Sequence, residues 1–140
     1  MDGLERFVAA QRDIYPRALA ELMRGRKASH WMWFVFPQIA GLGHSAMAVR
    51  YAIDDLAEAR AYLAHPVLGA RLCEAAGAML AHAGTSAEAI LGAIDAIKFR
   101  SSMTLFEAAA GGEAKAPFSG CLVAFYGGER DPETLRRLTG

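Results

Sequence analysis

Aromatic and polar side chains are concentrated over residues 27–38 of this sequence. Both tryptophans of the chain, Trp31 and Trp33, lie here beside His30 and Gln38. Aromatic walls with a few polar groups are typical of small-molecule pockets, although the same residue types also build an ordinary hydrophobic core. The segment is therefore a candidate pocket wall, and a purely structural role is the alternative.

Two further segments carry groups suited to binding an anion. Gly43 lets the backbone approach a ligand closely, and Ser45 suits the start of a helix with free N–H groups. A second segment brings together two cations and three hydroxyls: Lys98, Arg100, Ser101, Ser102 and Thr104. Such groups bind phosphate or carboxylate. The alternatives are a plain turn with a helix cap, and a polar helix face whose hydroxyls bond local backbone.

Metal binding and hydrolase-type nucleophiles are not indicated. None of the four histidines has His, Cys, Asp or Glu three or four residues away, and no Cys-x-x-Cys occurs. A local metal site is therefore not expected. The Gly-x-Ser-x-Gly elbow of many hydrolases is also absent from the sequence. We expect no metal and no cofactor, and the sequence alone names no reaction.

Charge and composition narrow the class of protein. The chain has 15 Lys+Arg and 15 Asp+Glu, a net charge of zero, so nucleic acid is not an expected partner. Residues 31–49 carry no charge, but Pro37 and Gly41 interrupt them, so we expect no membrane span. The N-terminus lacks an apolar signal core, and Cys73 and Cys121 lie among apolar residues. We expect two reduced thiols and a cytoplasmic protein.

The elements that must position these groups are predicted to be helices. The chain has 29 Ala against 5 Val, 6 Ile and 4 Thr, which favours helix over sheet. Cap residues or prolines predict helix starts at Asp2, Ser29, Ser45, Asp55, Pro66, Thr85, Asp95, Pro117 and Asp131. Pro16 either kinks the first helix or begins a second, and residues 30–36 form a short helix or a buried strand. We predict an all-α, single compact domain of about eight short helices over residues 1–140.

Several stretches resemble an uncharacterised family, DUF 1810. They are residues 7–22, Ser29 to Gln38, 41–45, 51–53, 58–72 and Arg100 to Phe106. The resemblance covers nearly the whole chain and implies a mainly helical single domain without an established activity. Members are sometimes labelled calpastatin. That label does not fit, because an inhibitor of that type is long, disordered and repeated, whereas this chain is short, apolar and unrepeated.

These observations lead to two hypotheses of function. The first is a binding protein or small enzyme for an anionic, nucleotide-like small molecule, in which Trp31 or Trp33 stacks a ring and Lys98 or Arg100 holds the charge. The second is a protein interaction module without catalysis that uses an exposed aromatic face. The first requires residues 29–45 and 98–104 to meet in one pocket, because their polar groups need partners.

Overall fold

The computed structural model describes residues 3–139, which form ten α-helices and one 3₁₀ turn without an extended strand. In chain order the elements are α1 (Glu5–Gln11), α2 (Tyr15–Arg24), α3 (Met32–Val35), α4 (Ala46–Arg50), α5 (Leu56–Ala64), α6 (Leu68–Leu80), α7 (Ala87–Leu91), α8 (Ala93–Ala109), η1 (Gly112–Lys115), α9 (Ala116–Tyr126) and α10 (Pro132–Thr139). The all-α prediction is confirmed, with ten α-helices in this part of the chain rather than about eight.

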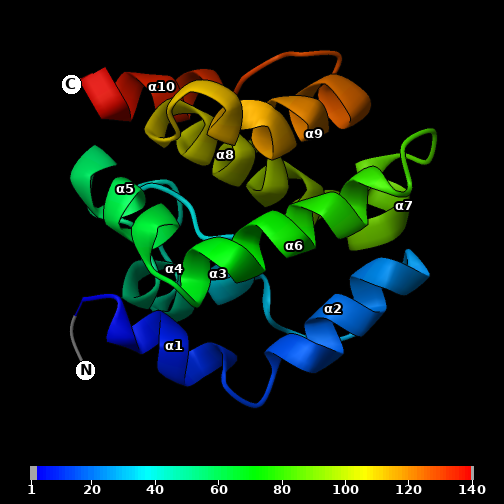
Figure 1. The fold of residues 1–140 in the computed structure, drawn as a ribbon, viewed down its shortest axis with the longest axis horizontal. Helices are drawn as coiled ribbons and strands as arrows, with labels where there is room; N and C mark the ends of the chain where they lie inside the picture. The colour runs from blue at the N-terminus through cyan, green and yellow to red at the C-terminus, as the bar shows by residue number, and fades with distance from the viewer. Residues whose placement is uncertain (1–2, 140) are drawn as a thin grey trace.

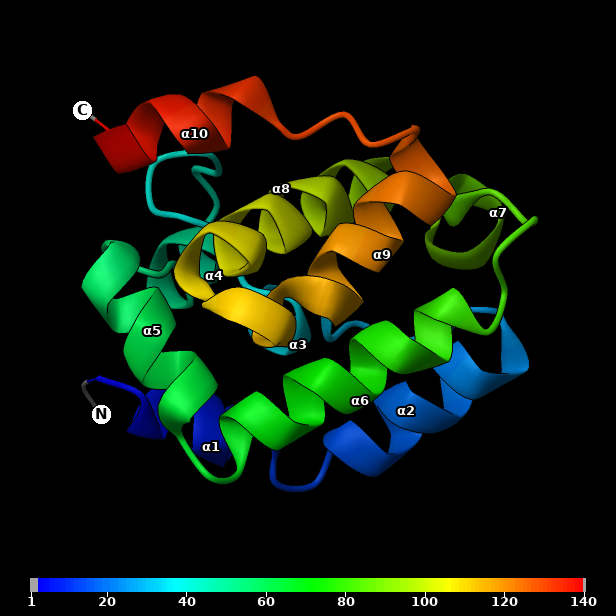
Figure 2. The same cartoon turned by 45° about the horizontal axis from the view of Figure 1, so that its top comes forward.

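Helix α6 crosses the middle of the molecule, with α1 and α2 on one side and α8 and α9 on the other (Figure 1). Helix α10 lies on the outside, beyond α8, and the loop that leads from α3 to α4 passes beneath it (Figure 2). Helix α8 packs against α5, α7, α9 and α10. It is therefore the element best placed to present residues 98–104 to several neighbours at once.

One continuous core fills the space between these layers. Its largest fully buried side chains are aromatic: Phe7, Trp31, Phe36, Tyr62, Phe99, Phe106 and Phe118. Edge-to-face pairs join distant segments, such as Phe36 with Phe99 at 4.8 Å between ring centroids. Such pairs add about 0.5–1.5 kcal/mol each to the effect of burial. The core therefore ties α3 to α8, which are remote in sequence.

Several predicted helix starts are confirmed. Three side chains accept a hydrogen bond from the backbone N–H three residues later: Ser45 from Ala48 (3.1 Å), Asp55 from Glu58 (2.9 Å) and Asp131 from Thr134 (3.1 Å). Pro16 begins a second helix rather than kinking the first, because α1 ends at Gln11 and α2 begins at Tyr15. Pro117 lies in the first turn of α9.

Five other predicted starts differ from the structure or lie outside it. Ser29 does not cap α3, because its hydroxyl donates to the Glu21 carboxylate instead. Asp95 does not cap α8, which begins after Gly92, because its carboxylate pairs with two lysines. Ser86, not Thr85, caps α7.

The remaining two starts concern Pro66 and Asp2. Helix α6 begins at Leu68, two residues after Pro66, and the imidazole Nδ1 of His65 accepts from the backbone N–H of Val67 and Leu68. The side-chain ring therefore does at this helix start what a Ser or Asp cap would do. Asp2 lies outside the described residues.

The loop over residues 37–45 is held on both sides. The carbonyl of Gln38 accepts from Ile53 N–H, and Ala40 N–H donates to the Ile53 carbonyl, both at 2.8 Å. Above it, Arg137 of α10 occupies the space beside Gly41: a Cβ at Gly41 would lie 2.2 Å from Arg137 Nη1. Gly41 has φ +96°, a conformation that glycine adopts without strain. The loop is thus fixed between a backbone bridge and α10.

Within residues 3–139, none of the helices combines the length and apolar character that a membrane crossing requires.

Candidate functional site

A hollow of about 200 Å³ opens between α3, the 37–45 loop, α4 and α8. Its apolar lining is Met32, Trp33, Phe36, Ile39, Ala48 and Tyr51, and its other lining residues are Gln38, Gly41, Gly43, His44, Ser45 and Lys98. The short helix α3 places Trp33 on the hollow because Phe34 and Val35 face the core, while the buried Met32 borders both. The predicted meeting of residues 29–45 with residues 98–104 is confirmed at Lys98.

Lys98 supplies the charge of this lining. Its ammonium Nζ lies 5.3 Å from the centroid of the Trp33 ring, within range of a cation–π contact. Asp95 is 3.6 Å away, but the same carboxylate is held at 3.0 Å by Lys27. One carboxylate therefore serves two lysines. The Lys98 side chain, 28% exposed, keeps hydrogen-bonding capacity for another acceptor.

Three polar side chains of the lining make no hydrogen bond to another described residue and are not among the buried, unpartnered groups: the Gln38 amide, the His44 imidazole and the Tyr51 hydroxyl. Tyr51 is 6% exposed, and its ring packs against Phe7 and Phe34. Ser45 accepts a bond from Ala48 N–H and retains its own hydroxyl proton as a donor. The hollow thus combines apolar walls with free donors and acceptors, which is the composition of a ligand pocket.

A shallower groove of about 340 Å³ adjoins the hollow and shares Gln38, Gly43 and Lys98 with it. Its other lining residues are Leu42, Ile94, Ile97, Ser101, Asp131 and Glu133. Ile94 and Ile97 are 71% and 69% exposed, although both are large and apolar. The groove is therefore apolar along α8 and acidic where α10 begins.

Gly43 has a packing reason to be glycine. A Cβ there would lie 2.6 Å from the Ala48 Cβ, so only glycine lets the loop lie this close to α4. The shape of the hollow depends on that approach, since Gly43 and Ala48 both line it.

Two predicted residues of the aromatic segment lie away from the hollow. His30 is exposed and lines none of the cavities described above. Trp31 is fully buried, and its indole Nε1–H donates to Glu21 Oε1 at 2.9 Å. Trp31 therefore belongs to the core, as the structural alternative proposed, and Trp33 alone of the pair faces the hollow.

Glu21, which the sequence did not single out as a binding partner of this segment, is the acceptor for four hydrogen bonds. It is 3% exposed and accepts from Ala28 N–H, Ser29 N–H, the Ser29 hydroxyl and Trp31. Burial by itself raises the pKa of Glu21, but the hydrogen bonds from Ser29, Ala28 and Trp31 outweigh it and lower the pKa to about 2. Glu21 is therefore ionised at neutral pH and fixes the chain that leads into α3.

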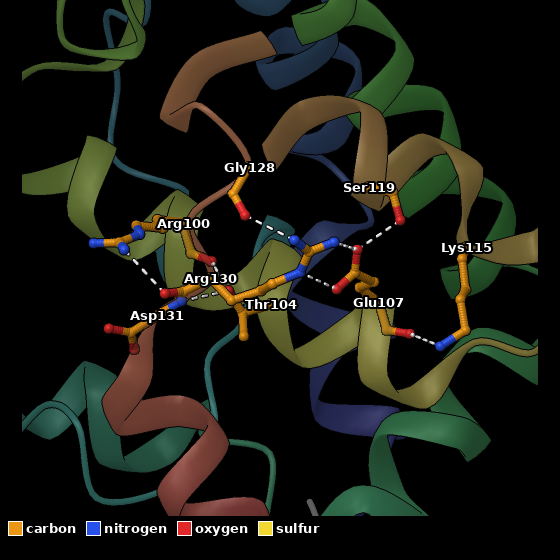
Figure 3. Close-up of polar contacts among 8 residues, drawn as sticks. All are labelled: Arg100, Thr104, Glu107, Lys115, Ser119, Gly128, Arg130 and Asp131. Carbon is orange, nitrogen blue, oxygen red and sulfur yellow. Dashed lines mark hydrogen bonds and ion pairs between the residues drawn. The ribbon is translucent and has the colours of Figure 1, made fainter. Parts of the chain in front are cut away.

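Most of the predicted cationic and hydroxyl cluster is engaged in holding α10. Arg100 donates to the carbonyls of Glu129 and Arg130, at 2.8 and 2.9 Å. Thr104 donates to the Arg100 carbonyl at 2.8 Å and accepts from Asp131 N–H at 2.9 Å (Figure 3). Both side chains therefore fix the segment between α9 and α10 rather than line the hollow.

The serines of the cluster differ from each other. Ser101 lines the groove, and its hydroxyl donates to Asp131 at 3.1 Å and lies 3.3 Å from the Ile97 carbonyl. Ser102 is fully buried, and its Oγ has no hydrogen-bond partner among the described residues. It lines neither the hollow nor the groove.

An ion-pair network continues this structural region toward α9. Arg130 binds both carboxylate oxygens of Glu107, at 2.8 and 2.6 Å, and Ser119 donates to the same carboxylate at 2.6 Å (Figure 3). The bidentate bond from Arg130, despite the desolvation of a mostly buried carboxylate, lowers the pKa of Glu107. These polar groups are paired with one another and face no cavity described here.

Sequence reasoning missed two residues that close the hollow at α4 and its end, Ala48 and Tyr51. A signal existed in the spacing, because a helix capped at Ser45 and ending near residue 50 returns Tyr51 toward the loop that precedes it. Met32, Phe36 and Ile39 were also missed as lining residues, since single side chains cannot be assigned to core or pocket from periodicity over a four-residue helix.

Metal ligands and reactive thiols do not add to this site. Among residues 3–139, no group of three or more His, Cys, Asp or Glu side chains converges to hold a metal ion. Both thiols are free, but only Cys121 is buried, and Cys73 on α6 is exposed rather than part of the core. Burial raises the pKa of Cys121 to about 12, so this thiol is a poor nucleophile.

Comparison with protein-family models identifies the class of this helical domain. A model described as "Protein of unknown function (DUF1810)" matches residues 1–138. The chain therefore belongs to the DUF1810 family, as its motifs predicted. Comparison with curated proteins gives no match.

A solved structure shares both sequence and fold with the chain. It is the crystal structure of the conserved hypothetical protein Rv1873 from Mycobacterium tuberculosis, which is 48% identical, with a TM-score of 0.94. The similarity covers 98% of this chain and 96% of that protein. The chain therefore shares its overall arrangement of helices with a protein of known structure.

Proposed function

We propose that this protein binds a small anionic molecule that carries a planar ring, such as a nucleotide fragment or an aromatic acid. The observation that carries the proposal is the pairing of Trp33 and Lys98 in the lining of one hollow, with the ammonium 5.3 Å from the ring centroid. The ring of the ligand would stack or pack on the aromatic wall, and its acid group would bind Lys98. The proposal covers a binding protein or a small enzyme acting on such a molecule.

The size of the hollow limits what enters it. Ligand pockets commonly measure about 300–1,000 Å³, and this hollow has about 200 Å³. A single ring with a short acidic substituent suits that volume, whereas a whole dinucleotide does not. Gln38 and Tyr51 would supply a donor and acceptors to the edge of the ring, which gives orientation as well as affinity.

The residues proposed to contact the ligand are fewer than the sequence predicted. They are Trp33, Gln38, Gly43, Ser45 and Lys98 from the prediction, together with His44 and Tyr51 from the structure. Arg100, Ser102, His30 and Trp31 are not included, because their contacts or positions turn them away from the hollow.

The alternative function is a protein interaction module, and one observation favours it. Ile94 and Ile97 are exposed side by side along α8, next to the hollow. Exposed apolar patches mark interaction surfaces when they are large and contiguous. Other exposed apolar side chains lie on different helices, such as Met23 on α2 and Val123 on α9. Neither nucleic acid nor a membrane is proposed as a partner, and the free thiols support a cytoplasmic location.

Titration calorimetry with ring-bearing acids tests the proposal. The ligands are phenylacetate, indole-3-acetate and uridine monophosphate, each measured against wild type, Lys98→Met and Trp33→Leu. We expect wild type to bind at least one of the three. Lys98→Met should weaken that binding about tenfold or more, since hydrogen bonds to charged groups contribute about 1.5–3 kcal/mol. Trp33→Leu should weaken it severalfold, since aromatic pairs contribute about 0.5–1.5 kcal/mol.

The matched control is Lys115→Met, which removes the same charge from an exposed position outside the hollow. It should bind like wild type. Failure of all three ligands to bind wild type, or equal binding by Lys98→Met, would contradict the proposal and favour the interaction module.

A further inference from the structure

The hollow and the groove are two parts of one surface. They share Gln38, Gly43 and Lys98, so a ligand bound at Lys98 lies where the two meet. The hollow admits one ring, and the groove offers about 340 Å³ more beside it. A ligand larger than a ring and an acid group would therefore continue into the groove.

The charges along this surface select the ligand's acid group. Lys98 is the cation of both linings, and Asp95, 3.6 Å from it, already offsets part of its charge. Asp131 adds a carboxylate to the groove, and Glu133 adds a second one whose charge Arg136 and Arg137 offset. A phosphomonoester carries about −1.5 to −2 at pH 7 and would be repelled by Asp95 and Asp131. A single negative charge, such as a carboxylate, matches one partly compensated lysine.

The side of the groove formed by α8 selects an apolar group. Ile94 and Ile97 are three residues apart and therefore share a helix face, and both are about 70% exposed. Leu42 completes this apolar strip from the 37–45 loop. Covering it removes apolar surface from water, which is favourable at about 25 cal/mol per Å².

We propose that the hollow and the groove together bind a monocarboxylic acid that carries an aromatic ring on one side of the carboxylate and an apolar chain on the other. The ring enters the hollow beside Trp33, the carboxylate binds Lys98, and the chain lies over Ile94 and Ile97. N-acyl aromatic amino acids have this arrangement of groups. This inference rests on the proposed function, because it assigns the ring and the acid to the same hollow.

Three compounds separate the contributions of the groups. N-acetyl-L-phenylalanine has the ring and the carboxylate, N-octanoyl-L-phenylalanine adds the apolar chain, and N-octanoyl-L-phenylalaninamide lacks the carboxylate. Calorimetry is done below the critical micelle concentration. We expect the octanoyl acid to bind at least about tenfold more tightly than the acetyl acid, since each buried CH₂ contributes up to about 0.8 kcal/mol. The amide should bind at least about tenfold more weakly than the octanoyl acid.

Substitutions on α8 test whether the octanoyl group of the ligand lies in the groove. In the double variant Ile94→Ser/Ile97→Ser the octanoyl acid should lose most of its advantage, while the acetyl acid binds as it does to wild type. Both positions are exposed, so the fold should tolerate the change. Val123→Ser is the matched control, since Val123 is 64% exposed on α9 and lines neither the hollow nor the groove.

The outcomes distinguish this inference from the proposed function. If the acetyl acid binds through Lys98 and the octanoyl chain adds nothing, the inference is wrong and the proposed function stands. The same holds if phenyl phosphate binds more tightly than phenylacetate, because the site would then prefer two charges. If no ring-bearing acid of either experiment binds, both are wrong.

Discussion

The network in Figure 3 and the lining of the hollow are two polar regions that share helix α8, and they differ in where their polar groups find partners. Arg100, Thr104 and Glu107 are bonded to other parts of the chain, mostly to the segment that leads into α10. Gln38 and His44 have no partner among the described residues. A high density of polar residues is therefore not by itself a sign of a binding site, and the proposed site rests instead on polar groups around an apolar hollow that are not bonded to the rest of the chain.

Among polar side chains that are bonded within the chain, Glu21 should have the largest effect on stability when it is replaced. Glu21→Leu should lower the free energy of unfolding by about 3 kcal/mol or more, because it leaves the buried Trp31 Nε1–H and two backbone N–H groups without an acceptor. Urea unfolding followed by tryptophan fluorescence measures this. Glu113→Leu, at an exposed position, is the control. A loss below about 1 kcal/mol would show that the network at Glu21 contributes little.

The same carboxylate predicts a dependence of stability on pH. The pKa of Glu21 is about 2 in the folded chain against 4.5 for a free glutamate. A lowered pKa contributes stability that is present above pH 4.5 and is lost as the pH falls from 4.5 toward 2. Glu21→Gln, measured by urea unfolding at several pH values, should show a shallower decline than wild type over that range. Parallel curves would contradict the assignment.

Thr104 tests the network that holds α10. Thr104→Val keeps the shape of the side chain but removes the acceptor for Asp131 N–H, so stability should fall by about 1–2 kcal/mol. Because Thr104 does not line the hollow, binding of ring-bearing acids should stay within twofold of wild type. A large loss of binding with little loss of stability would contradict the assignment of Thr104 to a structural network.

Lys98 should show the opposite pattern. Lys98→Met should change the free energy of unfolding by less than about 1 kcal/mol, since its partly exposed ion pair with Asp95 is weak and Asp95 keeps Lys27 as a partner. Urea unfolding measures this on the sample used for calorimetry. A destabilisation like that of Glu21→Leu would mean that Lys98 is a structural residue.

Replacing Ser102 should change stability least, and in the opposite direction to the other substitutions. Its buried Oγ has no partner, so Ser102→Ala removes an unsatisfied polar atom and should leave stability unchanged or raise it by up to about 1 kcal/mol. Ser101→Ala is the comparison, since it removes the bond to Asp131 and should lower stability slightly. Differential scanning calorimetry resolves the two directions. A clear loss for Ser102→Ala would indicate a partner that the structure does not show.

Local signals in the sequence predicted much of this fold. Composition predicted the helical class, and the caps at Ser45, Asp55 and Asp131 act as expected because each bond joins residues three apart. The failures have a common cause. Ser29 binds Glu21, and Asp95 pairs with two lysines, instead of capping the nearest backbone. Side-chain partners of that kind are set by tertiary structure.

The candidate site was predicted in part for the same reason. Trp33, Gln38 and Lys98 meet as expected, because a segment rich in aromatic and polar groups needs partners from elsewhere in the chain. The difference between Trp31 and Trp33 could not be read from the sequence, since it depends on the position of Glu21. Arg100 was misjudged because the carbonyls of Glu129 and Arg130 are distant in sequence and carry no motif.

The hydrogen bonds of Glu21 also bear on the order in which the chain folds. They join Glu21 to Ala28, Ser29 and Trp31, so they close a loop of at most ten residues. Short loops form quickly because little chain entropy is lost in closing them. Trp33 and Lys98, by contrast, come from segments separated by nearly half the chain. We therefore expect the turn that positions α3 to form early, and the hollow to be completed late in folding, when α8 packs against it.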